Sequence, residues 1–583
     1  MRERYLRKNE KGEIIETPQG MFHRVAKAIA AVEKKYDKKA DTQVLEEEFY
    51  KMMTNLEFLP NSPTLMNAGT PISQLSACFV LPVFDSLKSI MKVVTDMSLI
   101  HQSGGGTGFS FSKLRPRGDI VRSTGGTASG PISFAQIFDK TTEVVKQGGR
   151  RRGANMGILD VSHPDILDFI AAKKEKGRLK NFNLSVAVTD KFMRAVQKNQ
   201  EYDLVNPRTK KPVKKLQARQ VFDLMALSAW ETGDPGLIFL DEINRKNPLP
   251  SLGKIEATNP CGEQPLLPYE SCNLGSINLA KFVTDGKLDL GRLKKIIHLA
   301  LHFLDNVIDA NRFPLKEIEQ QTKANRKVGL GVMGFAQMLI LLGIPYNSQK
   351  AQDSAAMIMK FINTEARKES VSLGKKRGSF PNFAKSVWAK KYPTMRNATC
   401  TTIAPTGSIS ILAGTSSGIE PLFALVFVRK VLEGARLLEI DPFFEKILKE
   451  KNLYDQKLLS EIAKSGSICK IQKIPKNLRQ LFVTSLDLDS SEHIKMQATF
   501  QKFTDNAVSK TINLPYDASI EEVRKAFISA WKLKCKGLTL YRYGSKEEQV
   551  LNLGKRIYKE AQEEFISAES EYAGGCEARV CPY

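Results

Sequence analysis

Short apolar runs alternate with helical segments and glycine-rich turns from about residue 60 onward, and this alternation constrains the fold more than any other feature. Residues 78–81, 184–188 and 237–240 are three such runs. Runs of this length are typical of buried strands, and strands that alternate with helices favour an α/β fold. The segment 328–344 is also nearly all apolar, but several glycines interrupt it, so we interpret it as a buried segment rather than a membrane span.

The two ends of the chain differ from this central part. A helical stripe begins at Phe22 and Val25, and Asp41 or Thr42 can cap a second helix. The residues after 545 are polar and charged, which predicts an exposed tail. We therefore expect a helical N-terminal region, an α/β domain and a tail over residues 1–59, 60–545 and 546–583.

The net charge of +24 allows two interpretations. One is a lysine-rich solvated surface, and the other is a field that attracts nucleotides or nucleic acid. Lys and Arg are spread along the chain without a zinc-finger or RRM-type signature, so nucleic-acid binding is not expected. The first residues are charged and lack the apolar core of a signal peptide, which favours a soluble, cytoplasmic protein.

Cysteine usage favours catalytic or inert thiols over structural disulfides, because the sequence shows no signal peptide. The sequence has no CxxC pair and no HExxH motif, and its six histidines are not at metal-ligand spacing. A protein-ligated metal is therefore not expected. The eight cysteines are Cys78, Cys261, Cys272, Cys400, Cys469, Cys535, Cys576 and Cys581.

The segment from Asn259 to Pro265 groups a thiol, a carboxylate and a carboxamide on one short piece of chain. Pro260 and Pro265 exclude a continuous helix there. If the piece is extended, Asn259, Cys261 and Glu263 point to the same face, because they occupy alternate positions. That face would carry a reactive sulfur, a proton acceptor and a polar anchor. The alternative is a loop with an incidental buried cysteine.

Four further stretches stand in a fixed order around this segment. Residues 61–69 lead into Ser76, Ala77 and Cys78, and residues 104–108 and 147–157 are glycine-rich. Residues 402–410 precede a Gly-Ile-Glu-Pro sequence. Together with Cys261 and Cys272, these stretches resemble the catalytic subunits of ribonucleotide reductases from about residue 5 to about residue 550.

The resemblance implies a ten-stranded α/β barrel with a central finger loop and assigns roles to individual residues. Cys261 matches the thiyl radical that takes hydrogen from the ribose 3′ carbon, and Glu263 matches the base that removes the 3′-hydroxyl proton. Asn259 matches the residue that holds the sugar hydroxyls. Cys78 and Cys272 match a dithiol that supplies two electrons and closes to a disulfide.

Nucleotide-binding positions follow from the residues and from the resemblance. The run from Pro405 to Ser410 offers small residues and consecutive backbone N–H groups before a predicted helix, an arrangement that binds anions. By resemblance, the substrate site comprises Ser62, Ala77, Gly106, Pro405, Thr406, Gly407, Ser408 and Ile409. The positions that match effector contacts and the two specificity loops are Asp85, Ser86, Arg115, Arg122, Lys146, Gln147 and Arg151.

The segment around Arg542 bears on the radical source. Reductases that depend on a separate radical subunit carry two adjacent tyrosines there, whereas Arg542 separates Tyr541 and Tyr543 in this chain. This pattern resembles the adenosylcobalamin-dependent enzymes, although those more often have an acidic residue where Tyr543 stands. No Asp-x-His-x-x-Gly motif is present, so the cobalamin would keep its own base on cobalt.

The resemblance also implies partners. We expect a ribonucleotide substrate, a dNTP or ATP effector, a homodimer, and a thioredoxin- or glutaredoxin-like reductant served by a shuttle of Cys576 and Cys581. An N-terminal ATP-binding cone is expected to be absent. The alternatives are a catalytic subunit that relies on a separate metal-bearing radical subunit, and a non-catalytic nucleotide- or nucleic-acid-binding protein.

Overall fold

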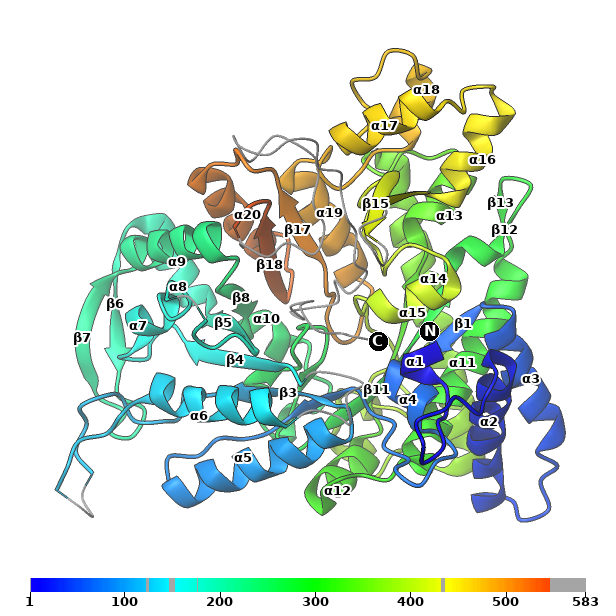
Figure 1. Ribbon diagram of the computed structural model, residues 1–583. Helices are drawn as coiled ribbons and strands as arrows, with labels where there is room; N and C mark the ends of the chain where they lie inside the picture. The colour runs from blue at the N-terminus through cyan, green and yellow to red at the C-terminus, as the bar shows by residue number, and fades with distance from the viewer. Residues whose placement is uncertain (1, 122–124, 146–152, 176, 431–435, 546–583) are drawn as a thin grey trace.

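The computed structural model describes residues 2–121, 125–145, 153–175, 177–430 and 436–545 (Figure 1). Several positions singled out in the sequence lie outside the described residues: Arg122, Lys146, Gln147, Arg151, Cys576 and Cys581.

The N-terminal region is helical, as the apolar stripe predicts. Its helices are α1 (Arg2–Tyr5), α2 (Pro18–Ala30), the 3-10 helix η1 (Ala31–Lys35) and α3 (Gln43–Thr54). Thr17 caps α2 by accepting a hydrogen bond from the Gly20 N–H. The two predicted cap residues share the start of α3: Thr42 occupies the N-cap position, and the Asp41 carboxylate accepts from the Gln43 N–H at 2.9 Å.

A ten-stranded sheet forms the centre of the molecule, and the three predicted strands are confirmed within it. Its strands in spatial order are β1 (Phe58–Pro60), β11 (Ser271–Asn278), β2 (Cys78–Val80), β3 (Gly106–Ser110), β4 (Asn155–Asp160), β5 (Phe182–Val188), β8 (Gly236–Phe239), β18 (Gly537–Arg542) and β17 (Thr511–Leu514), with β14 (Val328–Met333) also paired to β11. Five consecutive strands run parallel to one another: β2, β3, β4, β5 and β8. The strands on either side of this group are antiparallel to it, β11 next to β2 and β18 next to β8.

Two isolated bridges close this sheet into a barrel. Leu330 of β14 pairs with Thr401, and Ile403 pairs with Val508, which lies just before β17. The expected ten-stranded α/β barrel is therefore confirmed. A hairpin of two very short strands, β9 (Ala257–Thr258) and β10 (Pro265–Leu266), carries the predicted finger loop.

Two glycines of β3 let this hairpin pass close to the barrel wall. A Cβ atom on Gly108 would lie 1.7 Å from the Thr258 carbonyl oxygen, and one on Gly106 would lie 2.9 Å from Pro260 Cγ. A side chain at position 108 would therefore collide with the backbone of the hairpin, which explains the need for glycine there.

Helices and small hairpins surround the barrel (Figure 1). The helices are α4 (Ser62–Asn67), α5 (Leu87–Gln102), α6 (Pro131–Val144), α7 (Ile166–Ile170), α8 (Asp190–Lys198), α9 (Ala218–Thr232), α10 (Leu240–Arg245), α11 (Leu290–Ala310), α12 (Lys316–Asn325), α13 (Phe335–Leu341), α14 (Gln349–Arg377), α15 (Gly407–Ala413), α16 (Pro442–Glu450), α17 (Gln456–Ser465), α18 (Lys476–Leu481), α19 (Ser490–Gln501) and α20 (Ile520–Lys532). The remaining strands pair as β6 (Glu201–Val205) with β7 (Pro212–Gln217), β12 (Val283–Thr284) with β13 (Lys287–Leu288), and β15 (Val426–Lys430) with β16 (Arg436–Ile440).

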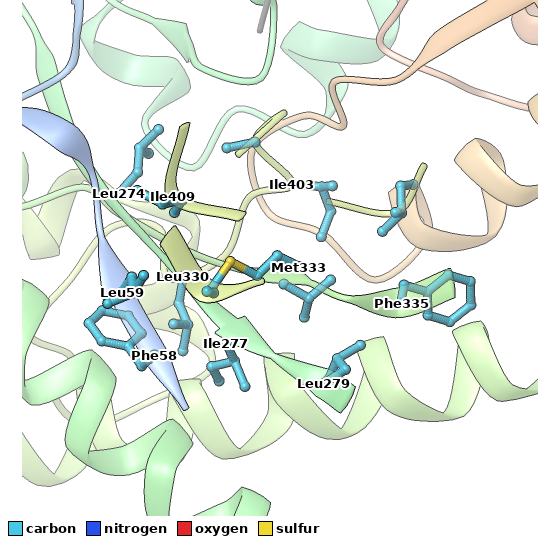
Figure 2. Packing of buried hydrophobic residues seen from close by; sticks show 14 of the residues in the cluster. Phe58, Leu59, Leu274, Ile277, Leu279, Leu330, Met333, Phe335, Ile403 and Ile409 are labelled. Carbon is cyan, nitrogen blue, oxygen red and sulfur yellow. The ribbon is translucent and has the colours of Figure 1, made fainter. Parts of the chain in front are cut away.

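The larger apolar core lies against strands β1, β11 and β14. Phe58, Ile277 and Leu330, one from each strand, are fully buried and lie together there (Figure 2). The apolar segment 328–344 contributes β14 and α13 to this core, which confirms that it is a buried segment. Within the described ranges, no helix combines the length and apolar character needed to cross a membrane.

Candidate active site

The finger loop is a closed turn rather than an extended piece of chain. The Asn259 N–H donates to the Gln264 carbonyl at 3.2 Å, and the Asn259 carboxamide oxygen accepts from the Gln264 N–H at 2.9 Å. Gly262 has a φ of 80°, in the left-handed region that favours glycine. The exclusion of a helix is confirmed. The extended geometry predicted for Asn259, Cys261 and Glu263 is wrong, because the hydrogen bonds between Asn259 and Gln264 close this segment into a turn.

Neighbouring segments hold the turn in place. The Asn183 carboxamide donates to the Pro260 carbonyl at 2.9 Å. The Glu263 carbonyl accepts from the Thr402 hydroxyl and from the Ala507 N–H, each at 2.9 Å. Strand β5 and the two segments that close the barrel thus all hold the turn by hydrogen bonds.

Cys78 and Cys272 face each other across two neighbouring antiparallel strands. The register of β2 and β11 pairs Cys78 directly with Cys272. Side chains of directly opposed residues point to the same face of a sheet, and their Cα separation of about 4.5–5.5 Å falls within the range that a disulfide spans. Both residues are buried thiols in this structure. Burial raises the pKa of the Cys272 thiol well above its ordinary value, so this thiol is protonated at neutral pH.

The dithiol and the finger loop meet at Cys78. The Asn259 carboxamide donates to Cys78 Sγ at 3.1 Å, and the Cys78 thiol donates to Glu263 Oε1 at 3.8 Å. Asn259 and Glu263 are both 2% exposed, whereas Cys261 at the tip of the turn is partly exposed. The Glu263 carboxylate and the Asn259 carboxamide thus contact the Cys78 thiol, which can pair with Cys272. The Cys261 thiol belongs to the same turn.

An open cavity gathers these groups, and its empty space is about 850 Å³ when the open solvent at its mouth is included. The eight positions predicted for the substrate all line it, together with Cys78, Asn259, Cys261 and Glu263. Cys272 does not line the cavity, and it lies opposite Cys78 on the neighbouring strand.

The run predicted to bind phosphate forms one wall of the cavity. Thr406 is the N-cap residue of α15 and adopts a φ of 59°, and its hydroxyl accepts from the Gly418 N–H at 2.7 Å. The N–H groups in the first turn of a helix have no intrahelical acceptor. Those of Gly407, Ser408 and Ile409 therefore give this wall donors suited to an anion.

The predicted effector residues that are described lie apart from the cavity wall. Ser86 caps α5 by accepting from the Ser89 N–H at 3.2 Å. Asp85 forms an ion pair with Arg115, whose Nε lies 2.9 Å from Asp85 Oδ2. The structure therefore brings Asp85, Ser86 and Arg115 together.

Several residues of the site carry no predicted role in the sequence. Leu274, Gly275 and Ser276 of β11 line the cavity, as do Pro63, Gly105 and Ala154. Leu274 and Ser276 stand two and four residues after Cys272, and the two-residue period of a strand was a usable signal for them. Tyr5 is different: its hydroxyl lies 2.9 Å from the Ser62 hydroxyl, across 57 residues of sequence, and no local pattern indicates this.

The histidines do not contribute to this site. Among the described residues, no histidine lines the cavity, and no group of three or more His, Cys, Asp or Glu side chains is arranged to hold a metal ion.

Comparisons with known proteins agree on one family. The family model "Ribonucleotide reductase, barrel domain" matches residues 76–395 and 390–541, and "Ribonucleotide reductase, all-alpha domain" matches residues 1–73. The chain is 50% identical to a vitamin B12-dependent ribonucleoside-diphosphate reductase of Thermoplasma acidophilum, over 97% of this chain and 80% of that protein. It is 48% identical to a protein of the same description from Mycobacterium tuberculosis, over 100% of this chain and 82% of that protein.

One solved structure shares the fold at lower sequence identity. The class Id ribonucleotide reductase alpha subunit of Actinobacillus ureae superposes with a TM-score of 0.76 and is 23% identical, over 93% of this chain and 95% of that chain.

Proposed function

The chain belongs to the ribonucleotide reductase family, and we propose that it reduces ribonucleotides to 2′-deoxyribonucleotides with adenosylcobalamin as the radical source. The observation that carries this proposal is the cross-strand pair of Cys78 and Cys272 beside the turn that bears Cys261. The two relatives of about 50% identity are named vitamin B12-dependent ribonucleoside-diphosphate reductases, which favours a diphosphate substrate. The alternatives of a subunit-dependent reductase and of a non-catalytic binding protein are not favoured.

The turn supplies the groups for the first step. A thiyl radical on Cys261 takes the hydrogen atom from the ribose 3′ carbon and becomes a thiol. Glu263 accepts the proton of the 3′-hydroxyl, and the Asn259 carboxamide holds the sugar hydroxyls. The partial exposure of Cys261 toward the cavity supports its role, because the sulfur must meet both the radical source and the sugar.

The dithiol supplies the electrons. The 2′-hydroxyl leaves as water, and Cys78 and Cys272 give up two electrons and two protons as they close to a disulfide. Cys261 then returns a hydrogen atom to the 3′ carbon and is a thiyl radical again. Cys78 suits the position next to the sugar, because it lines the cavity and accepts a hydrogen bond from Asn259.

The cavity is compatible with a cobalamin that keeps its own base. No described histidine lies at its wall, and the small residues Gly105, Gly106 and Ala154 are among those that line it. Bound adenosylcobalamin would supply the one-electron oxidation that turns the Cys261 thiol into a thiyl radical.

Regulation and reduction complete the proposal. A dNTP or ATP effector binds at Asp85 and Ser86 near Arg115, and the enzyme works as a cytoplasmic homodimer. Cys576 and Cys581 carry electrons from a thioredoxin- or glutaredoxin-like protein to the buried disulfide. The division into residues 1–59, 60–545 and 546–583 also stands as a proposal.

The decisive experiment is CDP reduction with a small dithiol, in the presence and absence of adenosylcobalamin and with no second protein. We expect dCDP to form only when the cobalamin is added. A subunit-dependent reductase would stay inactive in both arms, and a non-catalytic binding protein would bind nucleotide without forming dCDP under any condition.

A further inference from the structure

We propose that a buried ion pair between Lys327 and Glu270 determines which sulfur of the Cys78–Cys272 disulfide is attacked and which one leaves when the disulfide is reduced. An incoming thiolate attacks Cys78, and the charge of Lys327 stabilises the thiolate that departs from Cys272. Lys327 is thus a positioning residue for the re-reduction step. The inference rests on the proposed function only in that Cys78 and Cys272 form a disulfide.

Cys272 lies between Cys78 on one side and Lys327 on the other. On one neighbouring strand its partner is Cys78. On the other side, the parallel register of β11 with β14 pairs Asn273 with Val328, which brings Lys327 beside Cys272. The Cys272 thiol donates to the backbone carbonyl of Lys327 at 3.5 Å, and the Lys327 ammonium acts on this thiol as a nearby charge.

The ion pair itself is almost completely shielded from solvent. Lys327 Nζ lies 2.6 Å from Glu270 Oε2, and the two side chains are 2% and 1% exposed. The Glu270 carboxylate also accepts from the Leu267 N–H and from the Asn325 carboxamide, each at 2.6 Å. The Glu270 carboxylate thus has three donors around it, and the Lys327 ammonium is one of them.

Such a pair is a poor way to stabilise a fold. Well-packed apolar residues in place of a buried ion pair are often neutral or stabilising, because the desolvation of two charges offsets their attraction. A buried lysine next to a redox-active thiol on the neighbouring strand therefore calls for a role other than stability.

The electrostatics distinguish the two sulfurs. Burial raises the pKa of the Cys272 thiol, and the charge of Lys327 acts against burial by lowering it, whereas Glu270 and Glu263 raise it further. A thiolate on Cys272 therefore depends on Lys327. Cys78 instead lines the cavity, where its sulfur accepts a hydrogen bond from Asn259 and where a small thiol can reach it.

The exchange balances with an external dithiol as the reductant. Its thiolate forms a bond to Cys78 Sγ, the bond between Cys78 and Cys272 breaks, and the electron pair leaves with Cys272 Sγ, which then takes up a proton. The second thiol of the reductant closes the reductant's own disulfide and releases Cys78. Leaving groups of lower pKa depart faster in this exchange, so Lys327 accelerates the first step.

The test uses the full-length protein without nucleotide or cobalamin. The protein is oxidised with diamide, treated with 2-mercaptoethanol, quenched with acid and mapped by peptide mass spectrometry. We expect the mixed disulfide on Cys78 and none on Cys272. The rate of disulfide reduction by dithiothreitol is then measured for the parent, for Lys327→Met and for Lys327→Arg. We expect this rate to fall about tenfold in Lys327→Met. In Lys327→Arg it should stay near the parent rate.

Two controls separate this role from a structural one. Lys173→Met breaks another ion pair of low exposure, in which Lys173 Nζ lies 3.1 Å from Asp234 Oδ2, and it should leave the reduction rate unchanged. Alkylation of Cys261, which lines the same cavity, reports access and should be equally fast in all variants.

Each contrary result has a distinct meaning. An adduct on Cys272, or equal reduction rates in Lys327→Met and the parent, overturns the proposal. If Lys327→Met does not fold, the proposal is tested by the position of the adduct in the parent and by the reduction rate of Lys327→Arg. A reduction rate about tenfold lower in Lys327→Arg, with unchanged access to Cys261, counts against a pure charge effect. Failure of Cys78 and Cys272 to form any disulfide overturns the proposed function instead.

Discussion

At the residue scale, Cys261 differs from most of the other described cysteines in its exposure. Cys78, Cys272, Cys400 and Cys535 are buried, whereas Cys261 is partly exposed at the wall of the cavity. Cys261→Ala should abolish deoxynucleotide formation and leave nucleotide binding intact, because no other group of the turn can form a thiyl radical. Product analysis and binding calorimetry on the same preparation check both parts.

The matched control is Cys469→Ala, since Cys469 is also partly exposed but does not line the cavity. It should retain activity, and the buried Cys400 and Cys535 should also tolerate alanine. Appreciable dCDP from Cys261→Ala would contradict the assignment of the radical cysteine.

Gly108 provides a second test at a single position. A methyl group there would collide with the Thr258 carbonyl, so Gly108→Ala should displace the hairpin that carries Cys261. We expect a strong loss of kcat with a stability cost of about 1–3 kcal/mol, as for overpacked cores. Gly291→Ala is the control, because the same atom there meets only the Asp289 carboxylate at 3.4 Å, and it should change neither quantity. Turnover assays and urea unfolding distinguish the two variants.

The chemical identity of the site could be predicted from the sequence, but its assembly could not. Asn259, Cys261 and Glu263 stand within five residues, so their grouping is visible in one line of sequence. The direct opposition of Cys78 and Cys272 depends on the pairing of two strands far apart in the chain, and no local pattern reports that register. The Lys327–Glu270 pair was missed for the same reason, because neither residue stands out among the many charged positions.

At the scale of elements, the N-terminal helices are joined to the barrel helices by a buried cluster of charges. Asp305 of α11 pairs with Arg326, Arg377 and Arg396. Arg377 also pairs with Glu33 of η1, so the cluster connects five separate segments. Burial alone would raise the pKa of Asp305, but the surrounding arginines bring it down to about 2.

This depressed pKa predicts acid lability. The Asp305 carboxylate contributes stability that is present above its ordinary pKa of 3.8 and is lost as the pH falls toward the folded value of about 2. Asp305→Asn should lower the free energy of unfolding at pH 7 by about 3–5 kcal/mol, because it leaves buried arginines without their partner. The difference from the parent should shrink between about pH 4 and pH 2.

Urea unfolding across this pH range measures the effect. Asp517→Asn is the control, since Asp517 is exposed, and it should give a curve that follows the parent at every pH. A constant difference between Asp305→Asn and the parent down to pH 2 would contradict the linkage.

The elements themselves were predictable to an uneven degree. The helical stripe of residues 20–57 and the three apolar runs each became the expected element, because periodicity over several turns or residues is a strong signal. Strands β9 and β10 have two residues each and leave no periodicity to detect. The closed turn between them depends on hydrogen bonds of Asn259 to Gln264, which the pattern of residue types does not reveal.

At the scale of the whole molecule, the barrel isolates the dithiol from large partners. Cys272 is fully buried and Cys78 is 3% exposed, so a reductant protein cannot reach either sulfur directly. Cys576 and Cys581 lie outside the described residues, and their role as a shuttle remains a prediction from the sequence. A variant with Cys576→Ser and Cys581→Ser should complete about one turnover from the reduced state and then stop with thioredoxin as the reductant.

A small dithiol should restore part of the rate of this double variant, because it can enter the cavity. Product formed per enzyme, counted with each reductant, measures the effect. Undiminished thioredoxin-driven turnover in the double variant would show that these two cysteines are not the shuttle.

The pairing of Cys78 with Cys272 also makes the thermal stability of this protein depend on whether these two cysteines are oxidised or reduced. A disulfide between them closes a loop of almost 200 residues, and a cross-link of that span destabilises the unfolded chain by about 5 kcal/mol. The strand register already places the two cysteines opposite each other, within the Cα separation that a disulfide spans. The oxidised enzyme should therefore melt at a higher temperature than the reduced enzyme. A thermal melting curve would then report the fraction of molecules in which the disulfide has not yet been reduced.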